Sequence, residues 1–129
     1  MGEDQGMHFD ELYVRDFTQN EIHIMGNALL DVRHFAGSHT FMIVGSRISD
    51  IDALNTKLHA VTRYLTPPIP ALIPVKLTRA EITVLENTLT AVPTTIPPYD
   101  FQSLMGVEEH EVAAVLERIK EIRAGLPPE

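Results

Sequence analysis

The sequence contains no cysteine among its 129 residues. This absence excludes disulfide bonds, thiolate metal sites and cysteine nucleophiles together. Long apolar runs are also missing, since no run approaches the roughly 18 residues that a membrane-spanning helix needs. The first four residues, MGED, carry negative charge, whereas a secretory signal peptide begins with positive charge. We therefore expect a cytoplasmic protein that does not enter a membrane.

Basic residues are scarce, with 10 lysines and arginines against 18 acidic residues and a net charge of −8. The deficit is unevenly placed. Residues 1–16 carry one arginine against five acids, and residues 77–128 carry four basic residues against eight acids. Non-specific affinity for nucleic acid comes mainly from basic side chains, so these segments would repel a phosphate backbone. We expect nucleic acid to be a poor partner.

The common catalytic motifs are absent as well. The sequence has no phosphate-binding loop, no dinucleotide fingerprint, no nucleophile elbow and no helix with paired zinc-binding histidines. We therefore expect a protein without catalytic activity and without a cofactor.

What the sequence does contain is an internal duplication. Residues 17–32 read FTQNEIHIMGNALLDV, and residues 77–92 read LTRAEITVLENTLTAV. Ordinary residue usage would give roughly one identity by chance over this length. The identical pairs are Thr18/Thr78, Glu21/Glu81, Ile22/Ile82, Asn27/Asn87, Leu29/Leu89 and Val32/Val92.

The similarity continues beyond these segments. Phe41 pairs with Phe101 at the same offset, and after one inserted residue 43–45 pairs with 104–106. Both units then close on prolines. The predicted organisation is an acidic N-terminal tail at 1–16, a first repeat at 17–68, a proline-rich connector at 69–76 and a second repeat at 77–129, with both repeats in one compact domain.

Each unit is predicted to begin with a helix. Thr18 with Glu21, and Thr78 with Glu81, fit the capping box, in which side chains satisfy the first free backbone amides. Gly37 is expected to end the first helix and Pro93 the second. Apolar residues recur at helical spacing on one face of each helix: Ile22, Met25, Leu29 and Val32, and Ile82, Leu85, Leu89 and Val92.

The last helix of each unit carries a similar apolar stripe, and Ser49 is placed to cap the first of these helices. The segment before it is ambiguous. Residues 39–46, HTFMIVGS, resemble a strand, whereas the matching residues 99–107, YDFQSLMGV, resemble a short helix. The duplication favours a short helix in both, ending at Gly45 and Gly106. A strand at 39–46, paired with residues 11–14, is the alternative.

These elements predict a mainly α fold, a single domain of two pseudo-symmetric repeats. Each repeat consists of a helix, a short helix, a turn and a helix. The order resembles a helix-turn-helix, but the start of the last helix carries the acidic residues Glu108, Glu109 and Glu111, which cannot donate hydrogen bonds to bases. The shared geometry therefore does not favour binding to DNA.

Two groups of residues are candidates for an interaction surface. Asn27 and Asn87 are retained in both repeats although they lie opposite the apolar stripe, which indicates that this polar face contacts the neighbouring repeat or another subunit. Glu108, Glu109 and Glu111 occur in the second repeat only. A basic protein surface is the partner that such acids would attract.

A third candidate is a metal site of Asp31, His34 and His39. Asp31 and His34 are three residues apart on one helical face, a spacing that can share a metal ion. The plainer interpretation is a histidine stabilised by the negative end of a helix. We expect a non-enzymatic protein-interaction or regulatory module with a protein partner or a second copy. A helix-turn-helix DNA-binding regulator and a metal-binding protein are the alternatives.

Overall fold

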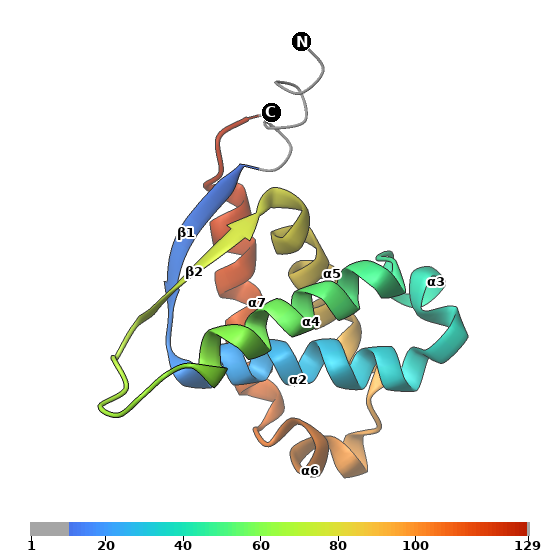
Figure 1. Ribbon diagram of the computed structural model, residues 1–129. Helices are drawn as coiled ribbons and strands as arrows, with labels where there is room; N and C mark the ends of the chain where they lie inside the picture. The colour runs from blue at the N-terminus through green and yellow to red at the C-terminus, as the bar shows by residue number, and fades with distance from the viewer. Residues whose placement is uncertain (1–10, 129) are drawn as a thin grey trace.

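Two short strands and several helices form the fold in the computed structural model, which describes residues 11–128 (Figure 1). The fold is mainly helical, as predicted. The first half consists of β1 (Leu12–Phe17), α2 (Gln19–Ala36), the 3-10 turn η1 (Gly37–His39), α3 (Thr40–Val44) and α4 (Ile48–Arg63). The second half consists of β2 (Ile73–Thr78), α5 (Arg79–Thr95), η2 (Pro98–Asp100), α6 (Phe101–Met105) and α7 (Glu109–Ala124).

The favoured prediction placed no strand in either segment, and only the alternative, which paired residues 11–14 with 39–46, expected a strand in the region of β1. β1 falls largely in the predicted acidic tail, whose residues 1–10 lie outside the described residues, and β2 falls largely in the predicted connector. The strands pair antiparallel, with Arg15 opposite Val75. In β2 the buried Ile73, Val75 and Leu77 alternate with exposed residues, which is the pattern of a strand with one face on the core. Pro74 is tolerated because a strand of a two-stranded sheet has a free edge.

The segment 39–46 is helical, so the alternative of a strand there is wrong. α3 and α6 are both short helices, and each ends at a glycine with positive φ, +83° at Gly45 and +74° at Gly106. Residues that carry a side chain rarely adopt this left-handed backbone conformation, so glycine is suited to the end of both helices. The bounds align Thr40 with Phe101, whereas the sequence paired Phe41 with Phe101. The inserted residue therefore precedes α3.

The capping boxes predicted for the first helix of each half are confirmed. The Thr18 and Thr78 hydroxyls accept hydrogen bonds from the backbone N–H groups of Glu21 and Glu81, both at 3.1 Å. In return, the two glutamates accept from the threonine N–H groups at 2.8 Å. Each box satisfies two amides that the helix itself leaves without partners.

Removal of either cap should destabilise the protein modestly. Thr18→Ala and Thr78→Ala are each expected to lower the free energy of unfolding by about 1 kcal/mol, because an N-cap hydrogen bond is lost. Urea denaturation followed by circular dichroism measures the change. Thr90→Ala is the control, since the Thr90 hydroxyl bonds to the Glu86 carbonyl within the helix and caps nothing. Equal stability of all three variants would contradict the role of the caps.

Helix ends agree with the sequence only in part. Gly37 ends α2 as predicted, with φ +55°. Pro93 does not end α5, because the helix continues to Thr95 and the Ile96 N–H still bonds to the Val92 carbonyl at 3.0 Å. Ser49 is not a cap, since α4 begins at Ile48 and Arg47 occupies the N-cap position without a side-chain hydrogen bond.

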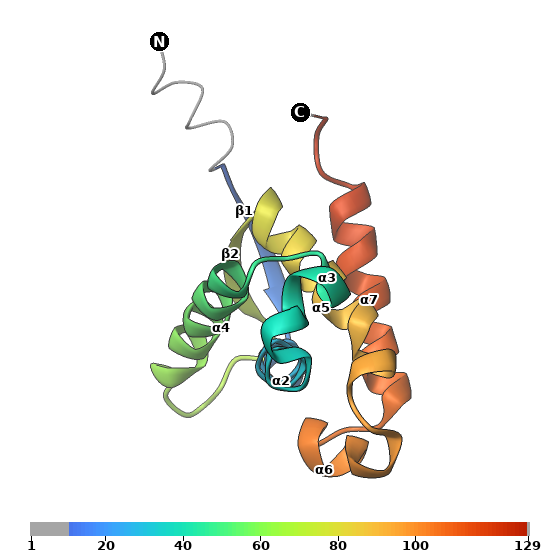
Figure 2. The ribbon, with the colours of Figure 1, turned by 90° about the vertical axis from the view of Figure 1, so that its right-hand side faces the viewer.

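The core lies where the four long helices meet the inner face of the sheet. α2 packs against α5, α4 packs against α2, and α7 packs against α5. Figure 2 shows α2 and α5 between α4 and α7. Among the helices of residues 11–128, none combines the length and the apolar character needed to cross a membrane. The largest fully buried side chains are Phe17, Ile22, Ile24, Met25, Leu29, Ile51, Leu54, Leu58, Leu77, Ile82, Leu85 and Leu89.

Candidate functional site

The two retained asparagines connect the halves of the molecule. The side-chain amide of Asn27, in α2, donates a hydrogen bond to the Met105 carbonyl at the end of α6, at 3.2 Å. The amide of Asn87, in α5, donates to the Ser46 hydroxyl just after α3, also at 3.2 Å. Each asparagine thus contacts the other half at the C-terminal end of its short helix or just beyond it. The polar faces that bear Asn27 and Asn87 therefore contact the other half of the molecule.

Two ion pairs cross between the halves in the same reciprocal way. Lys57 on α4 pairs with Glu81 at 2.7 Å, and Arg118 on α7 pairs with Glu21. Burial alone would raise the pKa of Glu21, but hydrogen bonds from Arg118 and Thr18, together with the charge of Arg118, hold it below its usual value. The capping glutamates therefore also tie the halves together.

The predicted metal site of Asp31, His34 and His39 is not formed. Within residues 11–128, no group of three or more histidine, aspartate or glutamate side chains is placed to hold a metal ion. Asp31 and His34 both lie on α2, close enough for the charge of His34 to lower the pKa of Asp31. His39 lies in η1, after Gly37 has ended α2. The sequence placed His39 after the Gly37 turn, but spacing alone could not show where that turn directs the chain.

The surroundings of Asp31 disfavour the ionised form of its carboxyl group. Burial raises the pKa of its carboxyl group, although the nearby His34 lowers it in part. The Oδ2 atom is buried and has no hydrogen-bond partner in the described part of the chain. An ionised acceptor without a partner is costly to bury.

Asp31→Asn should therefore stabilise the protein at neutral pH. Below the ordinary pKa of Asp31 the carboxyl is protonated in both states. As the pH rises to the raised pKa, the unfolded state loses its proton first, so wild type loses stability relative to the variant. The gain should be at most about 1 kcal/mol, since solvent still screens the partly exposed carboxyl. Denaturation at pH 3 and pH 7 measures it, with exposed Asp50→Asn as the control. An equal gain at both pH values would contradict the mechanism.

The acidic residues at the start of α7 have a structural role. Glu108 and Glu111 form a capping box, and the Glu108 N–H donates to the Glu111 carboxylate at 2.9 Å. Glu109 is exposed and makes no side-chain hydrogen bond or ion pair within residues 11–128. Of the three predicted contact residues, Glu109 is therefore the one that does not also cap the helix.

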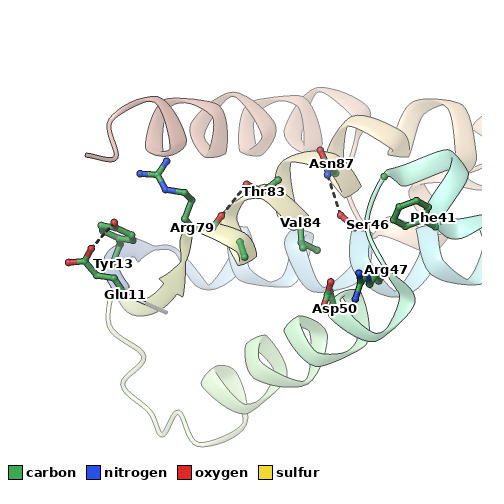
Figure 3. A pocket seen from close by; sticks show the side chains of 12 residues that line it. Glu11, Tyr13, Phe41, Ser46, Arg47, Asp50, Arg79, Thr83, Val84 and Asn87 are labelled. Atoms are coloured by element: carbon green, nitrogen blue, oxygen red, sulfur yellow. Dashed lines mark hydrogen bonds between the residues drawn. The ribbon is translucent and has the colours of Figure 1, made fainter. Parts of the chain in front are cut away.

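A pocket of about 410 Å³ lies between the halves (Figure 3). One wall comes from the first half, at the end of α3, the turn to α4 and the start of β1. The other wall is one face of α5. Such volumes are typical of small-molecule sites. The lining residues are Glu11, Tyr13, Phe41, Gly45, Ser46, Arg47, Asp50, Arg79, Ala80, Thr83, Val84 and Asn87.

The charged groups of this pocket differ in how they are held. At the β1 end, the Tyr13 hydroxyl donates to Glu11 at 3.0 Å, and Arg79 donates to the Pro127 carbonyl. At the α4 end, Arg47 and Asp50 point toward one another in Figure 3. Within residues 11–128 their side chains form neither an ion pair nor a hydrogen bond.

The middle of the pocket is better buried. Ser46 is 7% exposed and Val84 is 8% exposed. The Ser46 hydroxyl accepts a hydrogen bond from the Asn87 amide, a group that cannot act as a general base.

An exposed apolar segment adjoins the pocket. Phe41, Met42 and Ile43, which we term the α3 tip, are 61%, 85% and 50% exposed. Phe41 also lines the pocket. The corresponding positions in α6 are Gln102, Ser103 and Leu104. Sequence reasoning missed the α3 tip because it paired Phe41 with Phe101, a residue that is buried.

Comparisons of the chain with family models, with curated proteins and with solved structures found no match. The residues themselves are thus the basis for any functional conclusion.

Proposed function

We propose that this chain is a non-enzymatic protein-interaction module that contacts its partner through the α3 tip. The observation that carries the proposal is the exposure of three consecutive apolar side chains, Phe41, Met42 and Ile43. Isolated apolar residues on a surface are ordinary, but a contiguous apolar patch is typical of a contact surface. Burying the patch against a partner would remove apolar area from water and so favour association.

We also infer that the two halves are pseudo-symmetric repeats, in which the α3 tip is a departure from the shared pattern. The same order of elements, the same capping boxes and the reciprocal contacts of Asn27 and Asn87 support this inference. The strand pairing has the same symmetry. A shift of 60 residues relates Tyr13 to Ile73 and Phe17 to Leu77, so it converts the pair Tyr13/Leu77 into the pair Ile73/Phe17. Superposing residues 18–65 on 78–126 tests it, with a near-twofold rotation as the expected result.

A protein partner fits the charges better than DNA does. The N-cap position and the first turn of α7 together carry three glutamates, which would repel phosphate. At the start of α4 the basic Arg47 is accompanied by Asp50, so this end of the helix carries no excess of positive charge. A DNA-binding regulator therefore remains the second hypothesis, to be separated by experiment.

Affinity capture from the native host with matched variants tests the proposal. In the tip variant, Phe41→Gln with Met42→Ser, the α3 tip carries the residue types found in α6. The control is Tyr99→Ser, which removes a side chain that is 85% exposed but distant in sequence from the α3 tip. Wild type and control should retain one stoichiometric protein, and the tip variant should lose it by at least about tenfold, as expected when anchor residues are removed.

Denaturation curves of the three proteins show whether any loss of capture is caused by unfolding. The tip variant should unfold like wild type. Equal capture by all three proteins would refute the α3 tip as the contact surface. Capture of a specific DNA duplex by wild type would refute the interaction module in favour of the regulator.

A further inference from the structure

Two side chains of opposite charge line the α4 end of the pocket, and in the part of the chain that the structure describes they do not form an ion pair with one another. Arg47 occupies the N-cap position of α4, and Asp50 lies three residues later in its first turn. Within residues 11–128 neither side chain forms an ion pair or a side-chain hydrogen bond. A ligand that carries both charges could meet both groups, and a ligand with only one charge would be repelled by the group of the same sign.

We propose that this pocket binds a free apolar amino acid or a small zwitterion of the same kind. The ligand carboxylate would meet the Arg47 guanidinium, which matches a planar carboxylate with two donors. The ligand ammonium would meet the Asp50 carboxylate. The proposal goes beyond the interaction module and does not depend on it, because the ligand is bound by the isolated chain.

Apolar groups are placed to receive the side chain of such a ligand. Phe41 lies on one side of the pocket, and Val84 on α5 lies on the other (Figure 3). Ala80, also on α5, is a further apolar residue of the lining. The cavity of about 410 Å³ exceeds the volume of a single amino acid, so it admits a large apolar side chain. Burial of that side chain would supply most of the affinity, since charges at an exposed rim add little.

The opposite end of the pocket is less suited to the charged groups of the ligand. Glu11 already accepts a hydrogen bond from Tyr13, and Arg79 already donates to Pro127. A ligand would have to disrupt these contacts to bind there. The orientation is therefore set by Arg47 and Asp50, with the apolar side chain directed along α5.

Such a ligand would contact both halves at once. Arg47, Asp50 and Phe41 belong to the first half, and Val84 and Asn87 belong to the second. The Asn87 amide already bonds to Ser46 across this junction. Binding should therefore stabilise the junction and change the surroundings of Phe41, which also belongs to the α3 tip.

Three probes of equal apolar size separate the contributions of the two charges. L-Phenylalanine is the zwitterion, 3-phenylpropionate keeps only the carboxylate, and 2-phenylethylamine keeps only the ammonium. Titration of the ¹⁵N-labelled chain, followed by two-dimensional NMR, should show saturable shifts at residues 45–50 and 80–87. L-Phenylalanine should bind about two- to fivefold more tightly than either other probe, as expected for exposed ion pairs.

Two variants assign each charge to its residue. Arg47→Gln should reduce the affinity for L-phenylalanine to about that for 2-phenylethylamine. Asp50→Asn should reduce it to about that for 3-phenylpropionate. Arg63→Gln, at the exposed far end of α4, is the control and should change nothing.

Several outcomes would overturn the proposal. These are the absence of saturable shifts with L-phenylalanine, equal affinity for the three probes, and shifts confined to residues other than Phe41, 45–50 and 80–87. Unchanged discrimination in Arg47→Gln and Asp50→Asn would do the same. None of these outcomes bears on partner capture by the α3 tip, so the two proposals fail separately.

Discussion

Leu29→Ala and Leu89→Ala should each lower the free energy of unfolding by about 2–5 kcal/mol, the range for truncation of a buried leucine. Leu29 is 0% exposed and Leu89 is 1% exposed, and both belong to the core formed where α2 packs against α5. Truncation removes apolar contacts and leaves a cavity that the packed helices cannot fully close. Each variant should therefore unfold at a clearly lower urea concentration.

The matched control is the next residue in the chain. Leu30 is 54% exposed, so Leu30→Ala should change stability by no more than about 0.5 kcal/mol. Urea denaturation of the three variants, monitored by circular dichroism, gives the comparison. Leu29→Ala and Leu89→Ala curves that coincide with that of Leu30→Ala would show that the helix register is wrong.

Phe101→Ala should cost about 3–5 kcal/mol, whereas Phe41→Ala should cost less than about 1 kcal/mol. The two phenylalanines belong to corresponding short helices but differ in environment. Phe101 is 5% exposed and packs in the core near α2, whereas Phe41 is 61% exposed at the α3 tip. The difference follows from the alignment of Thr40, and not Phe41, with Phe101.

Thermal and urea unfolding of both variants measure this difference, with Gln102→Ala as an exposed control on α6. Similar losses from Phe41→Ala and Phe101→Ala would contradict the alignment of the short helices. Such a result would also contradict the exposure of Phe41, on which its contact with a partner depends.

Features with a local signature were predictable from the sequence. The capping boxes at Thr18 and Thr78 and the ends of α3 and α6 at glycine depend on a few neighbouring residues, and all were found as expected. The polar face that bears Asn27 and Asn87 was expected to meet something, and it contacts the other half.

The strands were missed for a physical reason. β1 carries Arg15 and Asp16 within an acidic region, and β2 contains Pro74, so each segment alone resembles a tail or a connector. Their conformation is determined by pairing across about sixty residues and by burial of one face against the helices. Such tertiary effects exceed local preference.

The candidate site depends on contacts that no local pattern indicates. The pocket combines β1, the turn after α3 and one face of α5, which are far apart in the chain. The three proposed metal ligands are not brought together, because Asp31 and His34 lie on α2 whereas His39 follows Gly37, where α2 ends. Arg47 and Asp50 gave no signal either, because a charged pair at a helix start usually lies in solvent.

The two-stranded sheet has a consequence for how copies of this chain meet. A free strand edge can template pairing with another chain and so initiate aggregation. Here Arg15 donates to the Val14 carbonyl at 2.8 Å, and Arg118 donates to the Asp16 carbonyl. On the other strand Pro74 has no N–H to offer. With both edges blunted in this way, continuous intermolecular sheets are disfavoured.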